Sequence, residues 1–334
     1  MKLLVVGGSG YLGRAVAVAA DRAGAQTLSL SRSGYHPAGP GAAGTGLVGD
    51  ATRPGFGLSG AALEEVREEV THVVLAFGSV RWDCPPSEAL AVHDTGMRTV
   101  LASLRQLRAL TRVVHVSSLL VLGRAEGLVG NRELFVGQRF RNWYEYGKYC
   151  AERRARDAGD LPVNIVRLGP VLGAPPAGLA LDTSHGLLAA LPYLLTGGPV
   201  HLDRRGHYPC YVSEVGSAAQ VIMNALNAPS TGQTWSWYDP DLPTLAQVYT
   251  DLCAAWGRIP RLVDVPALRP VLRLASRRVG VIPELLDYSR PWFELAPDIL
   301  SDLPGDRPVS GGDYVTTTGR HLRDRGRVMA GAMR

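Results

Sequence analysis

The sequence predicts an α/β protein built on a doubly wound parallel sheet, with a smaller substrate-binding region toward the C-terminus. Its 334 residues, 46% hydrophobic and 19% charged, can bury the core of one large domain or of two modest ones. Short apolar runs alternate with segments of helical spacing, which is typical of strand–helix–strand units. Beyond Leu168 this alternation loosens and prolines become frequent, which indicates loops and short helices.

The alternation predicts the elements in chain order. The apolar run after Met1 predicts a strand, and residues 12–23 predict the helix that follows it. Further strands are predicted at residues 26–31, 46–49, 71–77, 112–117 and 162–168, and helices at 61–69, 88–107 and 142–157. A strand at 208–212 and a helix at 213–226 predict that the chain returns to the main sheet. We expect a nucleotide-binding domain of residues 1–170, with a returning segment at about 205–227, and a substrate-binding region of residues 171–204 and 228–334.

Composition excludes several classes of protein. The cysteines form neither a CxxC pair nor a cluster with histidine at zinc spacing, so no disulfide framework and no metal site are expected. The basic residues behind the formal charge of +5 are scattered and accompany no DNA-reading motif, which argues against nucleic acid as a partner. The apolar stretch at 187–195 is about half as long as a membrane span. A reducing cytoplasm is the expected location.

Glycines cluster after the first predicted strand. Gly7, Gly10 and Gly13 fit the pattern GxxGxxG, and Gly8 with the last two fits GxGxxG. Glycine permits a tight turn there and lets the backbone N–H groups of the next helix approach a pyrophosphate. The position between a strand and a helix therefore predicts a dinucleotide-binding site.

The end of the second predicted strand indicates which dinucleotide binds. NAD-dependent dehydrogenases carry an acid here for the ribose 2′-hydroxyl, but this strand ends in Ser31, Arg32 and Ser33. A guanidinium and two hydroxyls suit a 2′-phosphate, so NADP is expected and NAD is less favoured. A merely solvated arginine is the alternative, because all but two of the 35 basic residues are arginines. Asp50, after the third strand, either faces the adenine or caps a turn.

One of the two lysines, Lys148, lies four residues after Tyr144 in the helix predicted at 142–157. Residues four apart share a helix face. A neighbouring ammonium stabilises a phenolate, so the pKa of Tyr144 is expected to fall from the ordinary value of about 10. The pair is a candidate general acid–base, and an ordinary helix pair is the alternative.

Over its first two thirds the chain resembles the extended short-chain dehydrogenase/reductase family, whose fold is of the Rossmann type. The resemblance is carried by Gly7–Gly13, Val114–Ser118, Tyr144–Lys148 with Ala151 and Glu152, Arg167–Gly173 and Tyr211–Val215. It implies that Tyr144 exchanges a proton with the substrate oxygen, that Lys148 binds the nicotinamide ribose and tunes Tyr144, and that Ser118 hydrogen-bonds the same oxygen. Ser118 is chosen by its spacing to Gly123, and Ser117 is the alternative.

The predicted ligand-binding residues lie mostly at the carboxyl ends of the strands. For the cofactor they are Gly7, Ser9, Gly10, Tyr11, Leu12, Gly13, Ser31, Arg32, Ser33, Asp50, Ala51, Ala76, Phe77, Gly78, Tyr144, Lys148 and Val171. For the substrate they are Ser79, Arg81, Trp82 and Leu119. An apolar wall that includes Phe135, Phe140 and Trp143 is expected beside them, although each aromatic residue could equally be core packing.

The chain departs from the family at three places. His93 stands where relatives commonly have asparagine, so a proton relay or backbone support at that position is in doubt, and a hydrogen-bonded helix histidine is the favoured interpretation. Many nucleotide-sugar epimerases and dehydratases that the chain resembles carry the motif NVYG at the position of residues 170–173 and VYG at that of residues 121–123, and this chain has neither. These departures favour a reductase of some other carbonyl.

The expected function is NADPH-dependent reduction of a carbonyl, or oxidation of the alcohol, in a small to medium and fairly apolar metabolite. One alternative is a nucleotide-sugar epimerase or dehydratase with tightly bound NAD. The other is a non-catalytic NADP-sensing regulator, although such sensors usually lack the Tyr/Lys pair. The resemblance also implies a homodimer formed through the helices that contain His93 and Tyr144.

Overall fold

Continuous apolar runs form the central strands, because a parallel sheet is buried on both faces. The strands are β1 (Lys2–Val6), β2 (Gln26–Ser31), β3 (Thr45–Val48), β4 (His72–Leu75), β5 (Arg112–Ser118), β7 (Val163–Leu168) and β11 (Thr234–Trp237). They form one parallel sheet in the order β11–β7–β5–β4–β1–β2–β3. The direction of chain progression reverses between β1 and β4, which is where open α/β sheets bind ligands.

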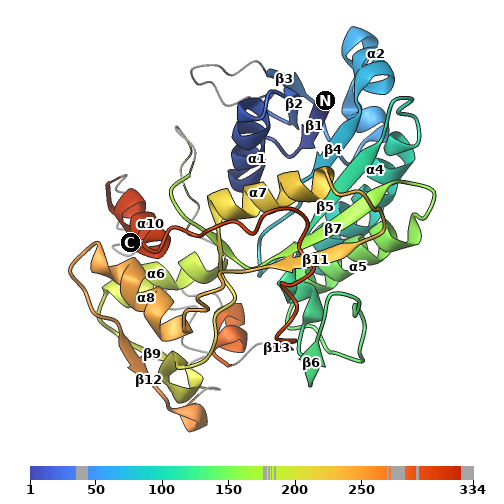
Figure 1. Cartoon of the computed structure of the whole chain (residues 1–334). Coiled ribbons are helices and arrows are strands. Elements are labelled where there is room, and N and C mark those ends of the chain that lie inside the picture. The colour runs from blue at the N-terminus through green and yellow to red at the C-terminus, as the bar shows by residue number, and fades with distance from the viewer. Residues whose placement is uncertain are drawn as a thin grey trace.

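The computed structural model describes residues 1–34, 44–175, 186–268, 283–290 and 293–324, with the single residues 179, 181, 183 and 271. Helices cover both faces of the sheet (Figure 1). Helices α1 (Tyr11–Arg22) and α7 (Val215–Leu226) pack side by side on one face. The other face carries α2 (Gly60–Glu69), α4 (Gly96–Leu104) and α5 (Trp143–Asp157). The predicted α/β class is therefore confirmed.

One predicted helix contains an irregular turn. Residues 88–107 were expected to be helical, and the chain there forms α3 (Pro86–Leu90), one π-helical turn η2 (Ala91–Thr95) and α4 without a break. A π turn carries one more residue than an α-helical turn. His93 lies inside this turn and is buried.

The strand predicted at residues 208–212 is wrong. In the structure this segment is irregular and makes one isolated bridge, between Pro209 and Thr244. Its backbone groups bond within the segment and to a neighbouring loop: Cys210 N–H donates to the carbonyl of Pro243, and Val212 N–H to that of Cys210. The helix predicted after it is confirmed as α7, preceded by β10 (Ser213–Glu214), which pairs with β8 (Val171–Leu172) outside the main sheet.

The C-terminal region consists of short elements. Its helices are α6 (Leu191–Leu195), α8 (Leu245–Ala254) and α10 (Tyr314–Asp324), and α8 contacts α10. Its strands form two-stranded ladders, β9 (Pro199–His201) with β12 (Arg261–Val263), and β13 (Glu294–Leu295) with β6 (Leu128–Val129). Strand β11 comes from the part of the chain expected to bind substrate, yet it pairs with β7, so a boundary at residue 227 would divide the sheet.

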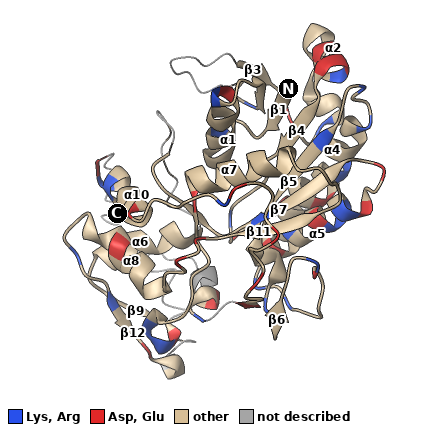
Figure 2. Ribbon diagram, viewed as in Figure 1, with Lys and Arg blue, Asp and Glu red and all other residues tan. Residues whose placement is uncertain are grey.

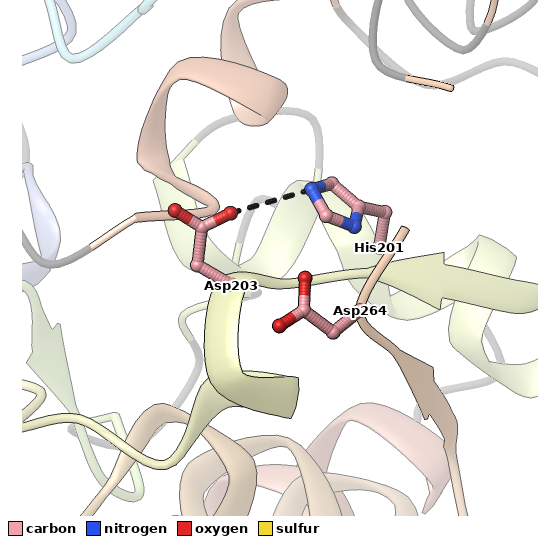
Figure 3. Close-up of side chains that lie close together, drawn as sticks. All are labelled: His201, Asp203 and Asp264. Carbon is pink, nitrogen blue, oxygen red and sulfur yellow. Dashed lines mark ion pairs between the residues drawn. The ribbon is translucent and has the colours of Figure 1, made fainter. Parts of the chain in front are cut away.

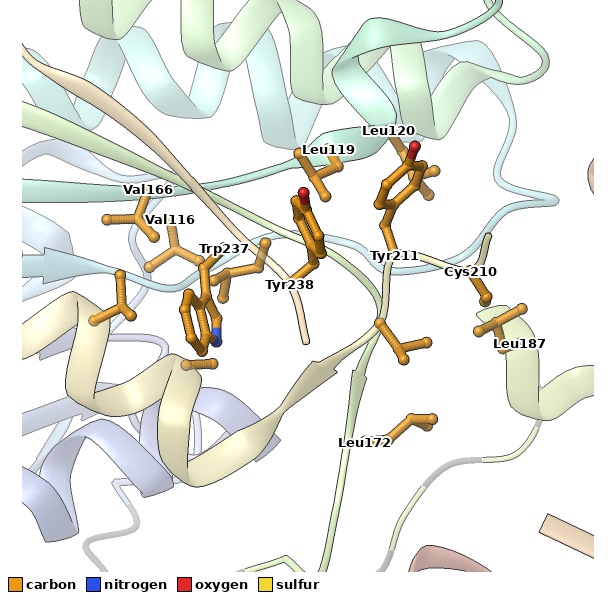
Figure 4. Close-up of a cluster of buried hydrophobic side chains, with 14 of the residues drawn as sticks. Val116, Leu119, Leu120, Val166, Leu172, Leu187, Cys210, Tyr211, Trp237 and Tyr238 are labelled. Carbon is orange, nitrogen blue, oxygen red and sulfur yellow. The ribbon is translucent and has the colours of Figure 1, made fainter. Parts of the chain in front are cut away.

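One hydrophobic core runs from the sheet into the C-terminal region (Figure 4). Val116 and Val166 of the sheet belong to the same buried cluster as Leu187 and Tyr211. Trp237 is fully buried within it, and its indole N–H donates to the Ser217 hydroxyl at 3.1 Å. The two regions are therefore held together by shared apolar packing.

The surface carries mixed charge. Among the described residues, basic and acidic positions are interspersed on the helices (Figure 2), and several pair, such as Arg105 with Asp160 at 2.6 Å. In the described part of the chain, no helix combines the length and apolar character that a membrane crossing requires. All four cysteines are free and buried.

Gly169 offers a test of how the sheet joins the C-terminal region. A Cβ at this position would overlap the carbonyl oxygen of Tyr211. We expect Gly169→Ala to lower the free energy of unfolding by about 2 kcal/mol or more, measured by urea denaturation. Gly159→Ala is the matched control, because a Cβ there meets nothing within 4 Å. Equal losses in the two variants would contradict this packing.

Candidate active site

The turn between β1 and α1 is shaped for close approach. Gly7 has φ +92°, and a Cβ there would lie 2.7 Å from the carbonyl oxygen of Ala76, in the segment after β4. Gly10 begins α1 with no side-chain cap, and no acidic residue lies in the first turn. Helix N-termini with free N–H groups bind anions. This turn therefore fits the pyrophosphate of a dinucleotide.

The other predicted cofactor residues surround this turn. Ala76, Phe77 and Gly78 follow β4 directly, and Ala51 follows β3. The Tyr11 hydroxyl donates at 2.8 Å to the carbonyl of Gly173, the residue that follows β8 with its Val171. Ser9 and Leu12 lie in the turn and in the first turn of α1. The structure therefore gathers these residues at one edge of the sheet.

The end of β2 presents polar side chains. Arg32 and Ser33 are exposed, and the hydroxyls of Ser31 and Ser33 lie 3.3 Å apart. Asp50 accepts hydrogen bonds from the N–H and the hydroxyl of Thr52, at 2.9 and 2.7 Å, so it caps a turn. These bonds, with smaller contributions from Arg53 and Arg32, lower the pKa of Asp50.

The first turn of α5 brings Tyr144 to Ser118. Asn142 caps this helix by accepting the N–H of Glu145 at 3.0 Å. The Ser118 hydroxyl lies close enough to that of Tyr144 to lower its pKa, and it accepts the N–H of Leu120 at 3.1 Å. The Ser117 hydroxyl instead donates to the Glu152 carboxylate at 2.6 Å. Of the two candidate serines, the structure places Ser118 beside Tyr144.

Burial controls the electrostatics of the Tyr/Lys pair. It raises the pKa of Tyr144 to about 12, although the hydrogen bond from Ser118 opposes this rise. It also lowers the pKa of Lys148 to about 8, and the Glu152 charge opposes that fall. The Lys148 ammonium donates to the carbonyl of Val116 at 2.8 Å. The expected fall in the pKa of Tyr144 is therefore wrong for this structure, because desolvation dominates and the opposing contribution comes from Ser118, not from Lys148.

His93 joins the segment after β4 to helix α5. Its Nε2 lies 3.1 Å from the Ser79 carbonyl, which can only accept, so Nε2 carries the proton. Burial and then the Lys148 charge lower the pKa of His93 to about 3, so the ring is neutral. A Cβ at Gly147 would lie 3.0 Å from the ring, which explains the glycine between Tyr144 and Lys148.

Sequence reasoning missed a buried ion pair behind the site. Arg167 of β7 and Glu152 of α5 both have fully buried side chains, and Arg167 Nη2 lies 2.7 Å from Glu152 Oε1. Arg156 and Ser117 donate to the same carboxylate. Arg167, a charged residue inside the apolar run of β7, is the sequence feature that could have predicted this pair. This pair ties the sheet to α5.

A second buried group lies near Lys148. His115 of β5 has a ring without a hydrogen-bond partner among the residues that the structure describes. Burial and then the Lys148 charge lower its pKa to about 3.

The substrate candidates separate in the structure. Trp82 lines a cavity of about 600 Å³ beside the first turn of α5, together with Cys84, Arg139, Phe140, Trp143 and Tyr146. Ser79 and Arg81 both bond to Glu88, at 3.1 and 3.2 Å. Leu119 is fully buried in the core, and Phe135 is 62% exposed. Of the four substrate candidates, Trp82 is the one that lines this cavity.

A separate polar cluster lies in the C-terminal region (Figure 3). His201 Nδ1 accepts the N–H of Val265 at 2.9 Å, so the proton of the neutral ring is on Nε2, which lies 3.4 Å from Asp203. A protonated nitrogen cannot ligate a metal ion. Asp264 accepts the N–H of Arg204, at 2.9 Å, in a turn where Arg204 has φ +49°. These bonds stabilise the contact between β9 and β12.

Comparisons with known proteins agree with this geometry. An NAD-binding family model, described as Male sterility protein, matches residues 45–202. The chain is 27% identical over 218 residues to the glycine betaine reductase ATRR of Emericella nidulans. That match covers 62% of this chain but 16% of the relative, so the chain spans about one sixth of that protein.

Solved structures share the fold. The terminal R domain of the myxalamid PKS-NRPS biosynthetic pathway is 22% identical with a TM-score of 0.77, covering 97% of this chain and 91% of that one. The UDP-glucuronic acid 4-epimerase of Bacillus cereus, in complex with NAD, is 13% identical with a TM-score of 0.70, covering 97% and 99%. At these identities the likeness shows the fold alone.

The buried ion pair between Glu152 and Arg167 predicts that the fold loses stability as the pH falls. Burial raises the pKa of Glu152, but Arg167, Arg156 and Ser117 together lower it to about 2. Since this pKa lies below the unfolded value of about 4.3, the pair stabilises the fold above that pH and loses its effect as pH falls toward 2. Glu152→Gln should cost about 3 to 5 kcal/mol at pH 7 and flatten the acid limb of stability against pH, measured by urea unfolding.

Glu126→Gln is the control, because Glu126 is exposed. A Glu152→Gln protein as stable as this control at pH 7 would refute the role of the pair.

Proposed function

We propose that this chain is an extended short-chain dehydrogenase/reductase that uses NADPH to reduce the carbonyl of a small to medium, fairly apolar metabolite. The observation that carries the proposal is the placement of Tyr144 beside Ser118 at the carboxyl end of β5, on the same edge of the parallel sheet as the glycine turn between β1 and α1. A pKa of about 12 keeps Tyr144 protonated at neutral pH. A protonated hydroxyl is what carbonyl reduction requires of a general acid.

The proposed mechanism assigns a role to each group. The glycine turn, the polar end of β2 and Lys148 would hold the cofactor, and NADPH, when bound, supplies the hydride. Ser118 donates a hydrogen bond to the substrate oxygen and Tyr144 transfers its proton to that oxygen, so the carbonyl becomes an alcohol. Tyr144 then regains a proton from solvent. Lys148, with its pKa near 8, adds positive charge close to the oxygen below that pH.

Reduction is favoured over epimerisation by the residues around the site. Positions 121–123 and 170–173 carry neither the tyrosines nor the asparagine of the motifs VYG and NVYG, which many sugar-nucleotide enzymes have there. Trp82, Phe140 and Trp143 give the neighbouring cavity aromatic walls, which suits an apolar body. NAD released when the purified protein is denatured would instead support the epimerase alternative. Retention of both Tyr144 and Lys148 argues against a purely sensing role.

The proposal includes a homodimer formed through α5 and the helical segment that contains His93. Trp143 is 43% exposed at the start of α5 and packs on Tyr146. Tyr149 follows one turn later and contacts Phe140. Exposed aromatic groups of this kind are typical of protein interfaces.

Arg32 supplies the test of cofactor choice. In wild-type protein we expect NADPH to raise the melting temperature more than NADH at equal concentration, because a ligand that binds the folded state stabilises it. Arg32→Ala should weaken NADPH binding about tenfold or more by removing a charge-assisted hydrogen bond to the 2′-phosphate, and should leave NADH binding unchanged. Arg22→Ala, an exposed arginine at the end of α1, is the control. Equal NADPH affinity in both variants would exclude Arg32 as the phosphate ligand.

Tyr144→Phe tests the acid. Removing the hydroxyl should lower kcat for carbonyl reduction by about 10² to 10⁴, while the dissociation constant for NADPH changes little. Tyr149→Phe, on the outer face of the same helix, should retain wild-type kcat. Steady-state kinetics on a screened carbonyl panel and fluorescence titration with NADPH measure the two quantities. Full activity in Tyr144→Phe would refute the assignment.

A further inference from the structure

The hydroxyl of Tyr288 connects the C-terminal region to the first turn of the catalytic helix. Tyr288 ends the short helix η8 (Pro283–Tyr288). Its hydroxyl donates to Glu145 Oε1 at 2.7 Å and accepts from Asn142 Nδ2 at 3.0 Å. Asn142 and Glu145 flank Tyr144 in the sequence. Tyr288 therefore bridges the residue two before the proposed acid and the residue directly after it.

The bridged residues belong to a buried polar network. Glu145 also accepts from the backbone N–H of Arg141 at 2.7 Å and from its guanidinium at 3.0 Å. The same guanidinium donates to the carbonyl of Gly123. The side chains of Arg141 and Glu145 are 3% and 0% exposed, and Tyr288 is 2% exposed. A satisfied network in such a setting restricts its members to one geometry.

Tyr288 is also held from two other directions. Its ring stacks on Trp82, with centroids 3.8 Å apart, and Trp82 lines the cavity beside α5. Its own carbonyl accepts from the Tyr208 hydroxyl at 3.4 Å, and the next carbonyl, of Ser289, accepts from Asp203 N–H at 2.8 Å. Tyr288 thus joins the C-terminal region, through its backbone, to the segment after β4 and to α5, through its side chain.

From these contacts we infer that Tyr288 is a positioning residue, whose hydroxyl holds the first turn of α5 so that Tyr144 meets the substrate oxygen beside Ser118. The inference rests on the proposed function. Misplacing a reacting group by about 1 Å costs on the order of 10² in rate, so fixing this turn affects catalysis directly. Docking of the C-terminal region, which carries Tyr288, therefore completes the active site.

Tyr288→Phe tests the inference because it removes both hydrogen bonds and keeps the ring on Trp82. We expect kcat to fall about 10- to 100-fold with KM and NADPH affinity little changed. Amide hydrogen exchange at Glu145 and Tyr146, whose N–H groups donate to Asn142, should accelerate more than about tenfold. Tyr193→Phe is the matched control, since its hydroxyl also lies in the C-terminal region and bonds to the Pro199 carbonyl at 3.4 Å.

The two readouts separate this inference from the proposed function. Exchange needs no substrate, so unchanged exchange in Tyr288→Phe overturns the inference even without a known reaction. Faster exchange with unchanged kcat overturns it as well, because the role is then only structural. If the wild-type protein reduces no carbonyl, the proposed function fails, and exchange alone decides whether Tyr288 positions this turn.

A second variant keeps the test informative if Tyr288→Phe does not fold. Asn142→Ser retains a good helix cap and removes the donor to Tyr288. It should reproduce the loss of kcat with unchanged NADPH affinity. Wild-type kcat in Asn142→Ser would count against the bridge.

Discussion

The contact between α5 and β5 is the constraint on which the site depends. Tyr144, Lys148 and Glu152 lie on one face of α5, four residues apart, and each meets the strand or its neighbour: Ser118, the Val116 carbonyl, and Ser117 with Arg167. Taking charges out of water is costly unless each is paired. A helix shifted along its axis would leave these groups unpaired. The buried polar face therefore specifies the register that places Tyr144 beside Ser118.

The same burial explains the direction of most large pKa shifts near the site. Burial raises the pKa of Tyr144 and lowers the pKa of three basic groups, Lys148, His93 and His115, because desolvation favours the neutral form of each group. Glu152 is the exception, because Arg167 is close enough to outweigh burial. At neutral pH Tyr144, His93 and His115 are therefore neutral, and Lys148, with a pKa of about 8, carries the charge among these four groups.

Local patterns predicted the sheet domain well, since its strands are apolar runs and its glycine turn and Tyr/Lys pair are short-range motifs. The predictions that failed depend on contacts between residues that are far apart in the sequence. Residues 208–212 look like a strand, but Pro209 lacks an N–H and the segment bonds to a loop near residue 243. Tyr288 is 143 residues from Glu145, and no periodicity relates the two positions. The pKa of Tyr144 was predicted in the wrong direction because burial depends on packing, which spacing does not reveal.

The π turn at Ala91–Thr95 has a consequence for how this chain is aligned with others. One extra residue rotates everything beyond it by about 100° around the helix axis. In this chain the extra residue lets two adjacent side chains, His93 and Asp94, both reach α5, the first against Gly147 and the second paired with Arg154. His93 can therefore be aligned with the asparagine of relatives only after the extra residue of this turn has been located. Deleting one residue here would turn a different face of the helix toward α5.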